Sequence, residues 1–461
     1  MALRLLSNAK LGGIAKQAVR PFASVASPST RITTLENGLT VASEHNPNSE
    51  AATVGVWIEA GSRADPAGKS GAAYFLEHVA FKGSKSRSEQ EILSLVGGKG
   101  AKLSARATRE HSIYTGSALG QDVPAVVELL AEAVQQPALD QQTIEKERAA
   151  VLRLQDESAT RLDEVAFENA HSVAFQGYAL ANPITGTYEG VKSLTAEDLS
   201  AYIKQNHTAD RMVLVGAGNV EHERLVDLAR KHFGSLSAGS RAKQSQTLFT
   251  GSEVRVRNDL LPVAHIVLGL EGPSWTSPDF LPMQVIQHVV GSWTKTLGSA
   301  GNVSARIAHT AQPNHLAESF SAFHLPYSDT GLFGVHLATT ARENIDDLVY
   351  FTTKELVRLA TSLTEADVYR AKNQLRASIG SALAESTELV AADIGTQVSV
   401  TGERLTPQQI ADKISQLTLK DIRRVAEKYI WDQELAVAGV GPVEAMPDYS
   451  RVRACMTSSK F

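Results

Sequence analysis

The segment from Gly71 to Lys82 (GAAYFLEHVAFK) contains the residues whose types and spacing come nearest to catalytic chemistry. In the inverted zinc signature His-x-x-Glu-His, two imidazoles four residues apart on one helix face hold a metal ion, and the glutamate activates a water molecule. Glu77 and His78 match the last two positions, but Tyr74 stands where the first histidine belongs. The segment therefore supplies a base and one ligand, and it lacks the second imidazole.

Tyr74 decides whether this pattern can bind zinc. A tyrosine phenol has a reference pKa of about 10, so it is a neutral hydroxyl at neutral pH, where zinc prefers imidazole, thiolate or carboxylate. Without a metal to lower the pKa of a bound water to about 7, Glu77 loses most of its advantage as a base. We therefore expect no catalytic residue, no metal and no cofactor here, with Glu77 and His78 as relics held by hydrogen bonds between helices. The alternatives are a residual metal site and a direct catalytic use of Glu77.

The elements that position this segment follow from the pattern of apolar residues. Val54, Val56 and Ile58 alternate with polar or small neighbours, which predicts a strand with one buried face. The charged residues between 145 and 164 lie at helical neighbour spacings, which is typical of a solvated helix face. Further strands are expected at 102–108 and 111–118, and helices at 122–135 and within 141–173. Strands and helices thus come in blocks, which favours an α+β fold with helices against a mainly antiparallel sheet.

An internal repeat gives the clearest sign of domain organisation. The stretch from Leu194 to Glu221 aligns without a gap on the stretch from Leu417 to Glu444, at a constant offset of 223 residues. Each copy predicts a threonine-capped helix with an acid in its first turn, then a short strand and a Gly-x-Gly turn. The aligned identities include Thr195 with Thr418, Asp198 with Asp421, Gly216 with Gly439 and Gly218 with Gly441.

The length of the chain fits two domains. With 461 residues, 43% of them apolar, the chain can bury two cores, since single cores stop growing at roughly 250 to 300 residues. We expect domains at 30–234 and 251–461, joined by a small, polar linker at 235–250. No run reaches the roughly 18 apolar residues of a membrane helix. Any membrane association should therefore go through partner proteins.

The N-terminal segment is basic and apolar. It carries four basic residues, no acid before Glu36, and leucines at roughly helical spacing, which is typical of a mitochondrial transit peptide. We predict removal of residues 1–22, with cleavage near Phe22. Losing four positive charges would take the formal charge from −5 to −9, so nucleic acid is not an expected partner. The only cysteine, Cys455, excludes an internal disulfide framework.

The chain resembles the mitochondrial processing peptidase family of zinc metallopeptidases. The resemblance rests on Gly61-Ser62-Arg63, on the segment from Phe75 to Ser84, on an edge strand around Ser104 and Arg106, and on the segment from Ile144 to Arg148. It extends from about residue 30 to the C-terminus. It implies two homologous metallopeptidase-like domains, each a mainly antiparallel sheet covered by helices.

The resemblance also implies a third zinc ligand, a carboxylate on a distant helix. Its distance from the second histidine of the signature places it at Leu154 or the neighbouring Gln155, and neither is a carboxylate. A shift by one turn would offer Asp156 or Glu157 instead. Ser104 stands where active relatives usually have asparagine, which weakens peptide binding in a cleavable register. Two of the three ligand positions are therefore expected to be lost.

Within this family, the chain resembles the core subunits of respiratory complex III most closely. These share the Tyr-Phe-Leu-Glu-His form. The segment from Val437 to Tyr449 resembles their tail, and residues 271–275 and 327–331 also resemble segments of these subunits. The resemblance implies a non-catalytic subunit needed for assembly and stability of ubiquinol–cytochrome c reductase, peripheral on the matrix side of the mitochondrial inner membrane. The implied partners are a second core subunit, cytochrome b, cytochrome c1 and other complex III subunits.

Other interpretations remain. One is an active zinc endopeptidase β subunit that cleaves mitochondrial presequences, and another is a module that binds presequences without cutting them. His111 could replace a ligand, but it follows a charged turn that looks exposed. The loop from Gly291 to Ala305 falls where the partner α subunit of the peptidase has a glycine-rich substrate loop. It has only three glycines, which favours a plain surface or interface loop.

Overall fold

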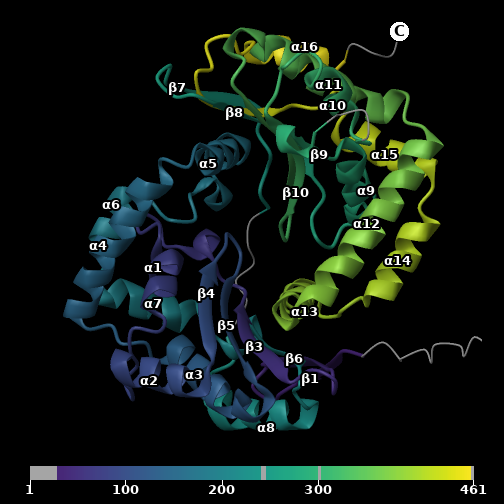
Figure 1. The fold of residues 1–461 in the computed structure, drawn as a ribbon. Helices are drawn as coiled ribbons and strands as arrows, with labels where there is room; N and C mark the ends of the chain where they lie inside the picture. Colours follow the sequence, from purple (N-terminus) through teal and green to yellow (C-terminus); the bar gives the residue numbers. More distant parts are fainter. Residues whose placement is uncertain (1–28, 240–245, 299–302, 458–461) are drawn as a thin grey trace, which may run out of the picture.

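The computed structural model describes residues 29–239, 246–298 and 303–457. The predicted transit peptide and its cleavage near Phe22 lie outside these residues. Two sheets, each covered by helices, follow one another along the chain (Figure 1). The expected α+β class with two similar, mainly antiparallel sheets is confirmed.

The first half is built around a six-stranded sheet of order β1-β2-β6-β3-β5-β4. Only the β2 and β6 pair is parallel, and β4 is an edge strand. The strands are β1 (Arg31–Thr34), β2 (Thr40–His45), β3 (Ala51–Ile58), β4 (Lys102–Ala107), β5 (Ser112–Leu119) and β6 (Met212–Gly218). The helices are α1 (Ala72–Val79), α2 (Glu89–Lys99), α3 (Val123–Gln135), α4 (Gln141–Ser158), α5 (Leu162–Ala174), α6 (Tyr188–Ser193), α7 (Ala196–Asn206) and α8 (His222–Phe233).

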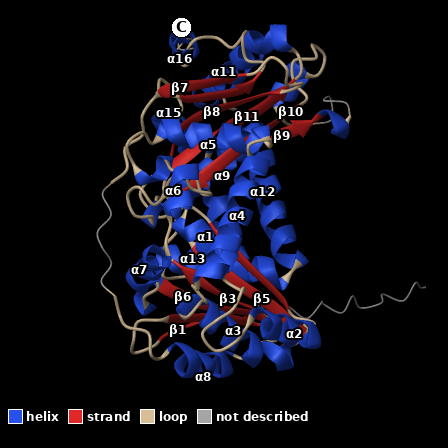
Figure 2. Ribbon diagram, turned by 90° about the vertical axis from the view of Figure 1, so that its left-hand side faces the viewer, coloured by secondary structure: helices blue, strands red, loops and turns tan. Residues whose placement is uncertain are grey.

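The second half repeats this topology with the order β7-β12-β8-β11-β10-β9, and again one pair, β12 with β7, is parallel. Figure 2 shows the two sheets stacked along the long axis, with helices between them and at both ends. The strands are β7 (Ser252–Arg257), β8 (Ala264–Gly272), β9 (Ser292–Thr294), β10 (Ser319–Pro326), β11 (Gly331–Thr339) and β12 (Ala436–Gly441). The helices are α9 (Phe280–Val290), α10 (Arg306–Ala311), α11 (Ile345–Thr361), α12 (Glu365–Glu385), α13 (Thr387–Thr401), α14 (Pro407–Gln416), α15 (Leu419–Tyr429) and α16 (Tyr449–Cys455).

The internal repeat is visible in the backbone. Thr195 and Thr418 each complete a capping box, with Asp198 and Asp421 respectively, at the start of α7 and α15. The glycines that end β6 and β12 both have positive φ, and a Cβ on Gly218 would lie 2.4 Å from the carbonyl oxygen of Ala51. The predicted helix–strand–turn unit is therefore confirmed in both copies.

Each half lends one helix to the other. Helix α5 of the first half packs on β12 and β8 of the second sheet, and α13 of the second half packs on β6 and β3 of the first. Each exchanged helix completes a small apolar cluster on a face of the other half's sheet, a face that the other half does not cover with a helix of its own. The α13 cluster comprises Ala42, Trp57, Val213, Val215, Ala217, Ala391, Ile394 and Val398.

This exchange corrects the expectation for β3. Val54, Val56 and Ile58 face the main core, as predicted, but the opposite face is buried as well. Trp57 on that face is only 1% exposed, because α13 lies over it. The one-sided strand expected from the alternation is therefore wrong.

The segment between the halves has no helix or strand in its described parts, 235–239 and 246–251. Residues 240–245 of the predicted linker lie outside the described residues. Within the described ranges, no helix combines the length and apolarity needed to cross a membrane.

Candidate functional site

Helix α1 starts at a glycine that holds it close to its neighbours. Gly71 has φ of +102°, and a Cβ there would come within 2.8 Å of the Val191 side chain. The Asp65 carboxylate accepts hydrogen bonds from the N–H groups of Gly71 at 2.6 Å and Ala73 at 3.0 Å. These groups lie at the N-terminus of α1, where the helix dipole favours an anion. Burial raises the pKa of Asp65 to about 6, against these hydrogen bonds. The start of α1, and with it the signature segment, is thus fixed.

Tyr74 packs on the imidazole whose partner ligand it replaces. The Tyr74 and His78 rings meet edge to face, with centroids 4.7 Å apart. Burial, and then the charge of Glu77, raises the pKa of Tyr74, so its phenol is harder to ionise than a free tyrosine. Burial, and then the charge of Lys82, lowers the pKa of His78. The pair is therefore a neutral phenol beside a neutral imidazole at pH 7.

Glu77 is held by the edge strand. Its Oε2 accepts the Ala107 N–H at the end of β4, at 2.6 Å. Burial raises the pKa of Glu77, although this hydrogen bond and the charge of Arg106 oppose the rise. The expectation that hydrogen bonds between helices satisfy Glu77 and His78 is wrong. Glu77 bonds to a strand, and the buried Nε2 of His78 has no hydrogen-bond partner among the described residues.

The position expected for the third ligand lies on α4. Leu154 carries no donor atom, and the amide of Gln155 points to a neighbouring turn, where it donates to the carbonyls of Thr185 at 2.8 Å and Gly186 at 3.0 Å. That turn packs backbone to backbone on the start of α1, since a Cβ on Gly186 would lie 2.4 Å from the Cα of Gly71. Gln155 therefore helps to position α1 from the place where a ligand would be expected.

The acids offered by a shifted alignment do not complete the site. Asp156 and Glu157 are both exposed on α4, and Glu157 pairs with Arg153 at 3.5 Å. Across the described ranges, no group of three or more histidine, cysteine or acidic side chains could hold a metal ion. The signature segment offers one imidazole, one carboxylate bound to the sheet, and a phenol. They do not fit a zinc site, for which three protein ligands are usual even in catalytic centres.

The turn before His111 is buried, so the expectation of an exposed charged turn is wrong. Arg109 is 6% exposed, pairs with Glu168 at 2.6 Å, and donates to the carbonyl of Leu180. His111 lies at hydrogen-bond distance, 3.2 Å, from the hydroxyl of Ser399 on α13. Helices α5 and α13 cover this turn from the two halves, which explains its burial. His111 therefore belongs to the contact between the halves.

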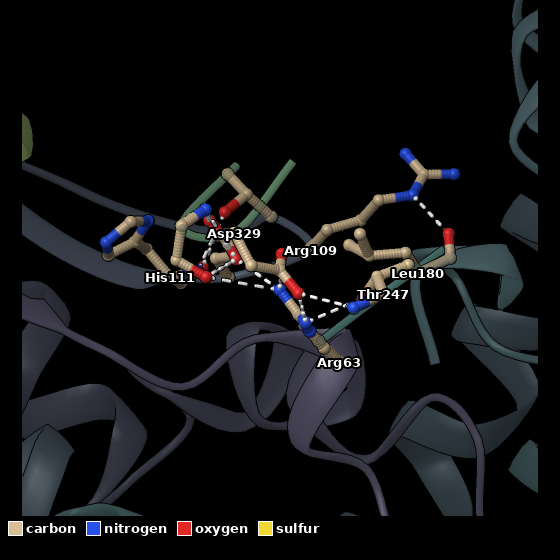
Figure 3. Close-up of polar contacts among 9 residues, drawn as sticks. Arg63, Arg109, His111, Leu180, Thr247 and Asp329 are labelled. Carbon is tan, nitrogen blue, oxygen red and sulfur yellow. Dashed lines mark hydrogen bonds and ion pairs between the residues drawn. The ribbon is translucent and has the colours of Figure 1, made fainter. Parts of the chain in front are cut away.

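Beside it lies a group that we call the interdomain ion cluster: Arg63, Glu110, Asp329 and the hydroxyls of Thr247 and Ser328. The Arg63 guanidinium binds both oxygens of Asp329, at 2.9 and 2.7 Å, and one oxygen of Glu110 at 2.7 Å. Figure 3 shows Arg63 directed at Asp329 and Thr247, whereas Arg109 extends away to Leu180. Burial would raise the pKa of Asp329, but the hydrogen bonds from Arg63 and Thr247 outweigh it and lower that pKa.

The cluster ties three separate parts of the chain together. Arg63 and Glu110 come from the first half, Asp329 from the second, and Thr247 from the segment that joins them. Nearby, the phenol of Tyr327 lies 2.7 Å from the Nε2 of His171 on α5. The sequence shows charged turns at 109–110 and 328–329, but no local pattern pairs residues more than 200 positions apart. The cluster therefore could not be predicted from the sequence alone.

The loop from Gly291 to Ala305, which has only three glycines, is only partly described. Gly291 is followed by the short strand β9, which pairs with β10. Residues 299–302 of this loop lie outside the described residues. The preference for a surface or interface loop over a substrate loop stays a prediction.

Comparison with known proteins places this architecture in a family. Residues 40–188 match the family described as Insulinase (Peptidase family M16), and residues 193–375 match the Peptidase M16 inactive domain. The mitochondrial-processing peptidase subunit beta of Lentinula edodes is 43% identical, covering 97% of both chains. The cytochrome b-c1 complex subunit 1 of Mus musculus is 42% identical, covering 94% of this chain and 91% of that protein.

A solved structure agrees with the fold. A chain of "Complex III2 from Candida albicans, Inz-5 bound" superposes with a TM-score of 0.84 at 27% identity, covering 93% of this chain and 100% of that chain. Since peptidase and complex III relatives are almost equally identical, overall identity does not separate the two. The two similar α+β halves, the two family matches and the relatives that cover nearly the whole chain nonetheless agree on one family. The chain belongs to peptidase family M16.

Proposed function

We propose that this chain is a non-catalytic core subunit of mitochondrial complex III, of the core protein 1 type, which supports assembly and stability of the quinol–cytochrome c reductase. One observation carries the proposal: the signature helix offers Tyr74 and His78 where zinc would need two imidazoles. Leu154 on α4 removes the expected carboxylate as well. The base, Glu77, is then left with a backbone N–H as its partner instead of a metal-bound water.

The proposed partners are a second core subunit, cytochrome b, cytochrome c1 and the other complex III subunits. The proposed location is the matrix side of the mitochondrial inner membrane, reached with the predicted transit peptide at residues 1–22. Support comes from the complex III relatives and from the basic N-terminal segment. The described halves are also tied together by a buried ion cluster and two exchanged helices, a construction suited to a rigid scaffold.

A second candidate is a zinc endopeptidase β subunit that cleaves presequences. It is favoured by the 43% identity to the mitochondrial-processing peptidase subunit beta of Lentinula edodes. The two candidates differ in metal content, because cleavage by this family's chemistry needs a polarised water.

The deciding experiment measures metal and cleavage together. The purified chain is analysed for bound zinc and is assayed with a basic presequence peptide, with and without a chelator. We expect less than stoichiometric zinc and no cleavage that the chelator abolishes. Stoichiometric zinc with chelator-sensitive cleavage would establish the second candidate. A native gel with mass spectrometry should in addition place the chain in a large inner-membrane assembly.

A further inference from the structure

A cavity of about 870 Å³ lies in the second half, between α10, α11 and the start of α12. In Figure 1, α10 and α11 lie at the end of the molecule remote from the first sheet, and Figure 2 shows α11 at that same end. The cavity is thus distinct from the signature segment on α1. Its volume is in the range of small-molecule sites.

The charges around the cavity do not balance. Arg358 is bound by both oxygens of Glu355, at 2.7 and 2.8 Å, and by Asp367 at 3.0 Å. Arg370 pairs with the other oxygen of Asp367 at 2.5 Å. These two arginines and two acids neutralise one another. The two acids also hold the guanidinium of Arg358, whose side chain is 11% exposed, in place.

Two further cations line the cavity without such a partner. Arg306 on α10 and Lys354 on α11 are exposed, and neither forms an ion pair among the described residues. The residues outside the described ranges contain no acidic side chain that could supply one. The cavity therefore carries about two uncompensated positive charges, although the chain as a whole has a formal charge of −5. A phosphate group, with a charge of about −1.5 to −2 at pH 7, would offset them.

The remaining lining fits the same ligand. The hydroxyls of Ser304, Thr310 and Ser362 add donors, and Ile307 and Phe351 supply an apolar part. Phosphate oxygens accept hydrogen bonds from such hydroxyl and guanidinium donors. The apolar part would contact the carbon portion of a phosphorylated molecule.

The fold does not require cations at this place. When the first residues of α3 and α11 are aligned, Lys354 falls on Glu132 of the first half. There Glu132 and Glu128 both pair with Arg87, at 2.5 and 2.7 Å, so the equivalent surface is closed by ion pairs. At this position, the first half has a paired acid where the second half has an unpaired cation.

We infer that this cavity binds a phosphate-bearing anion, through Arg306 and Lys354 together with the guanidinium groups of Arg358 and Arg370. The phosphate could be free, as inorganic phosphate or a phosphomonoester, or it could be a phospholipid headgroup. Both sources present anionic phosphate oxygens, with one or two charges on free phosphate or a phosphomonoester and one charge on a phosphodiester headgroup. The inference is independent of whether the chain cleaves peptides.

The test uses the full chain and the double variant Arg306→Gln with Lys354→Gln. Its matched control is Lys204→Gln with Arg224→Gln, two exposed cations that have no ion pair in the described part of the first half. Calorimetric titration with inorganic phosphate measures the free source. Co-sedimentation with phosphatidylcholine vesicles, with and without phosphatidylglycerol, measures the headgroup.

We expect phosphate to bind and its Kd to rise about tenfold for each cation removed, with no change in the control. Binding of phosphate alone would assign the free source. Additional retention on phosphatidylglycerol vesicles, lost in the same variant, would assign the headgroup. The inference fails if wild type binds neither probe, or if the control loses as much affinity as the cavity variant. Thermal melts of both variants check that they are folded.

Discussion

Removing Arg63 should loosen the two halves more than removing either of its acidic partners. Its side chain is 6% exposed and holds Asp329 and Glu110, whose side chains are 21% and 10% exposed. In the variant Arg63→Met, both carboxylates would stay buried and face each other without a counter-ion. In Asp329→Asn, Arg63 would keep Glu110 and lose one charge only. The order of the two effects follows from this asymmetry.

The magnitudes differ accordingly. Breaking a buried ion pair by removing one partner typically costs about 3 to 5 kcal/mol, and Arg63→Met should fall in this range. Asp329→Asn should cost about 1.5 to 3 kcal/mol, the range for one charged hydrogen bond. The matched control is Arg153→Met, which breaks an exposed pair with Glu157 on α4. Such exposed pairs contribute about 0 to 1 kcal/mol.

Urea unfolding, followed by circular dichroism, measures the three free energies on the same chain. Arg63 does not tie the halves together as described if Arg63→Met is no more destabilising than Asp329→Asn, or if it lies within about 1 kcal/mol of the Arg153→Met control. In that case the exchanged helices alone would hold the halves together.

Three further predictions rest on single sites. The double change Tyr74→His with Leu154→Glu should raise zinc affinity, measured by metal analysis after dialysis; no gain would mean that the third ligand position is not at residue 154. Gly395→Ala should destabilise the chain by about 1 to 3 kcal/mol in urea unfolding, because the new Cβ would lie 2.2 Å from the ring of Trp57, a residue that is 1% exposed. A neutral result would show that α13 shifts freely. Burial lowers the pKa of His207 to about 4, although the hydrogen bond to a backbone carbonyl opposes this shift. The contribution of His207 to stability is therefore present above the unfolded pKa of about 6.5 and is lost as the pH falls toward 4. His207→Gln should therefore remove a slope of about 1.4 kcal/mol per pH unit between these values, and an unchanged slope would contradict the burial argument.

The sequence was a good guide to elements and to their repetition. The capping boxes at Thr195 and Thr418 could be predicted because capping is local: the hydroxyl and the acid are three residues apart. The edge position of β4 followed from the family resemblance. Local chemistry and repetition thus carried most of the fold.

The contact between the halves could not be predicted from local patterns. The alternation in β3 indicated one buried face, and only Trp57, a large apolar residue on the other face, hinted that something covers it. The helix that covers it begins at Thr387, more than 300 residues later. The turn at 109–110 looked exposed because charges usually are, yet its partner acids and hydroxyls come from distant segments. Pairings of this kind depend on topology, which composition and periodicity do not encode.

The exchange of α5 and α13 also bears on how the chain can work. Without α13, the first sheet would expose the face formed by Ala42, Trp57, Val213 and Val215, and without α5 the second sheet would expose its equivalent face. An exposed apolar sheet face is an aggregation hazard, so neither half is expected to be stable alone. The chain must therefore fold with both halves together and keep them in one arrangement. Under the proposed function, a subunit that holds its partners in place gains from that rigidity, and this role needs no second imidazole at residue 74.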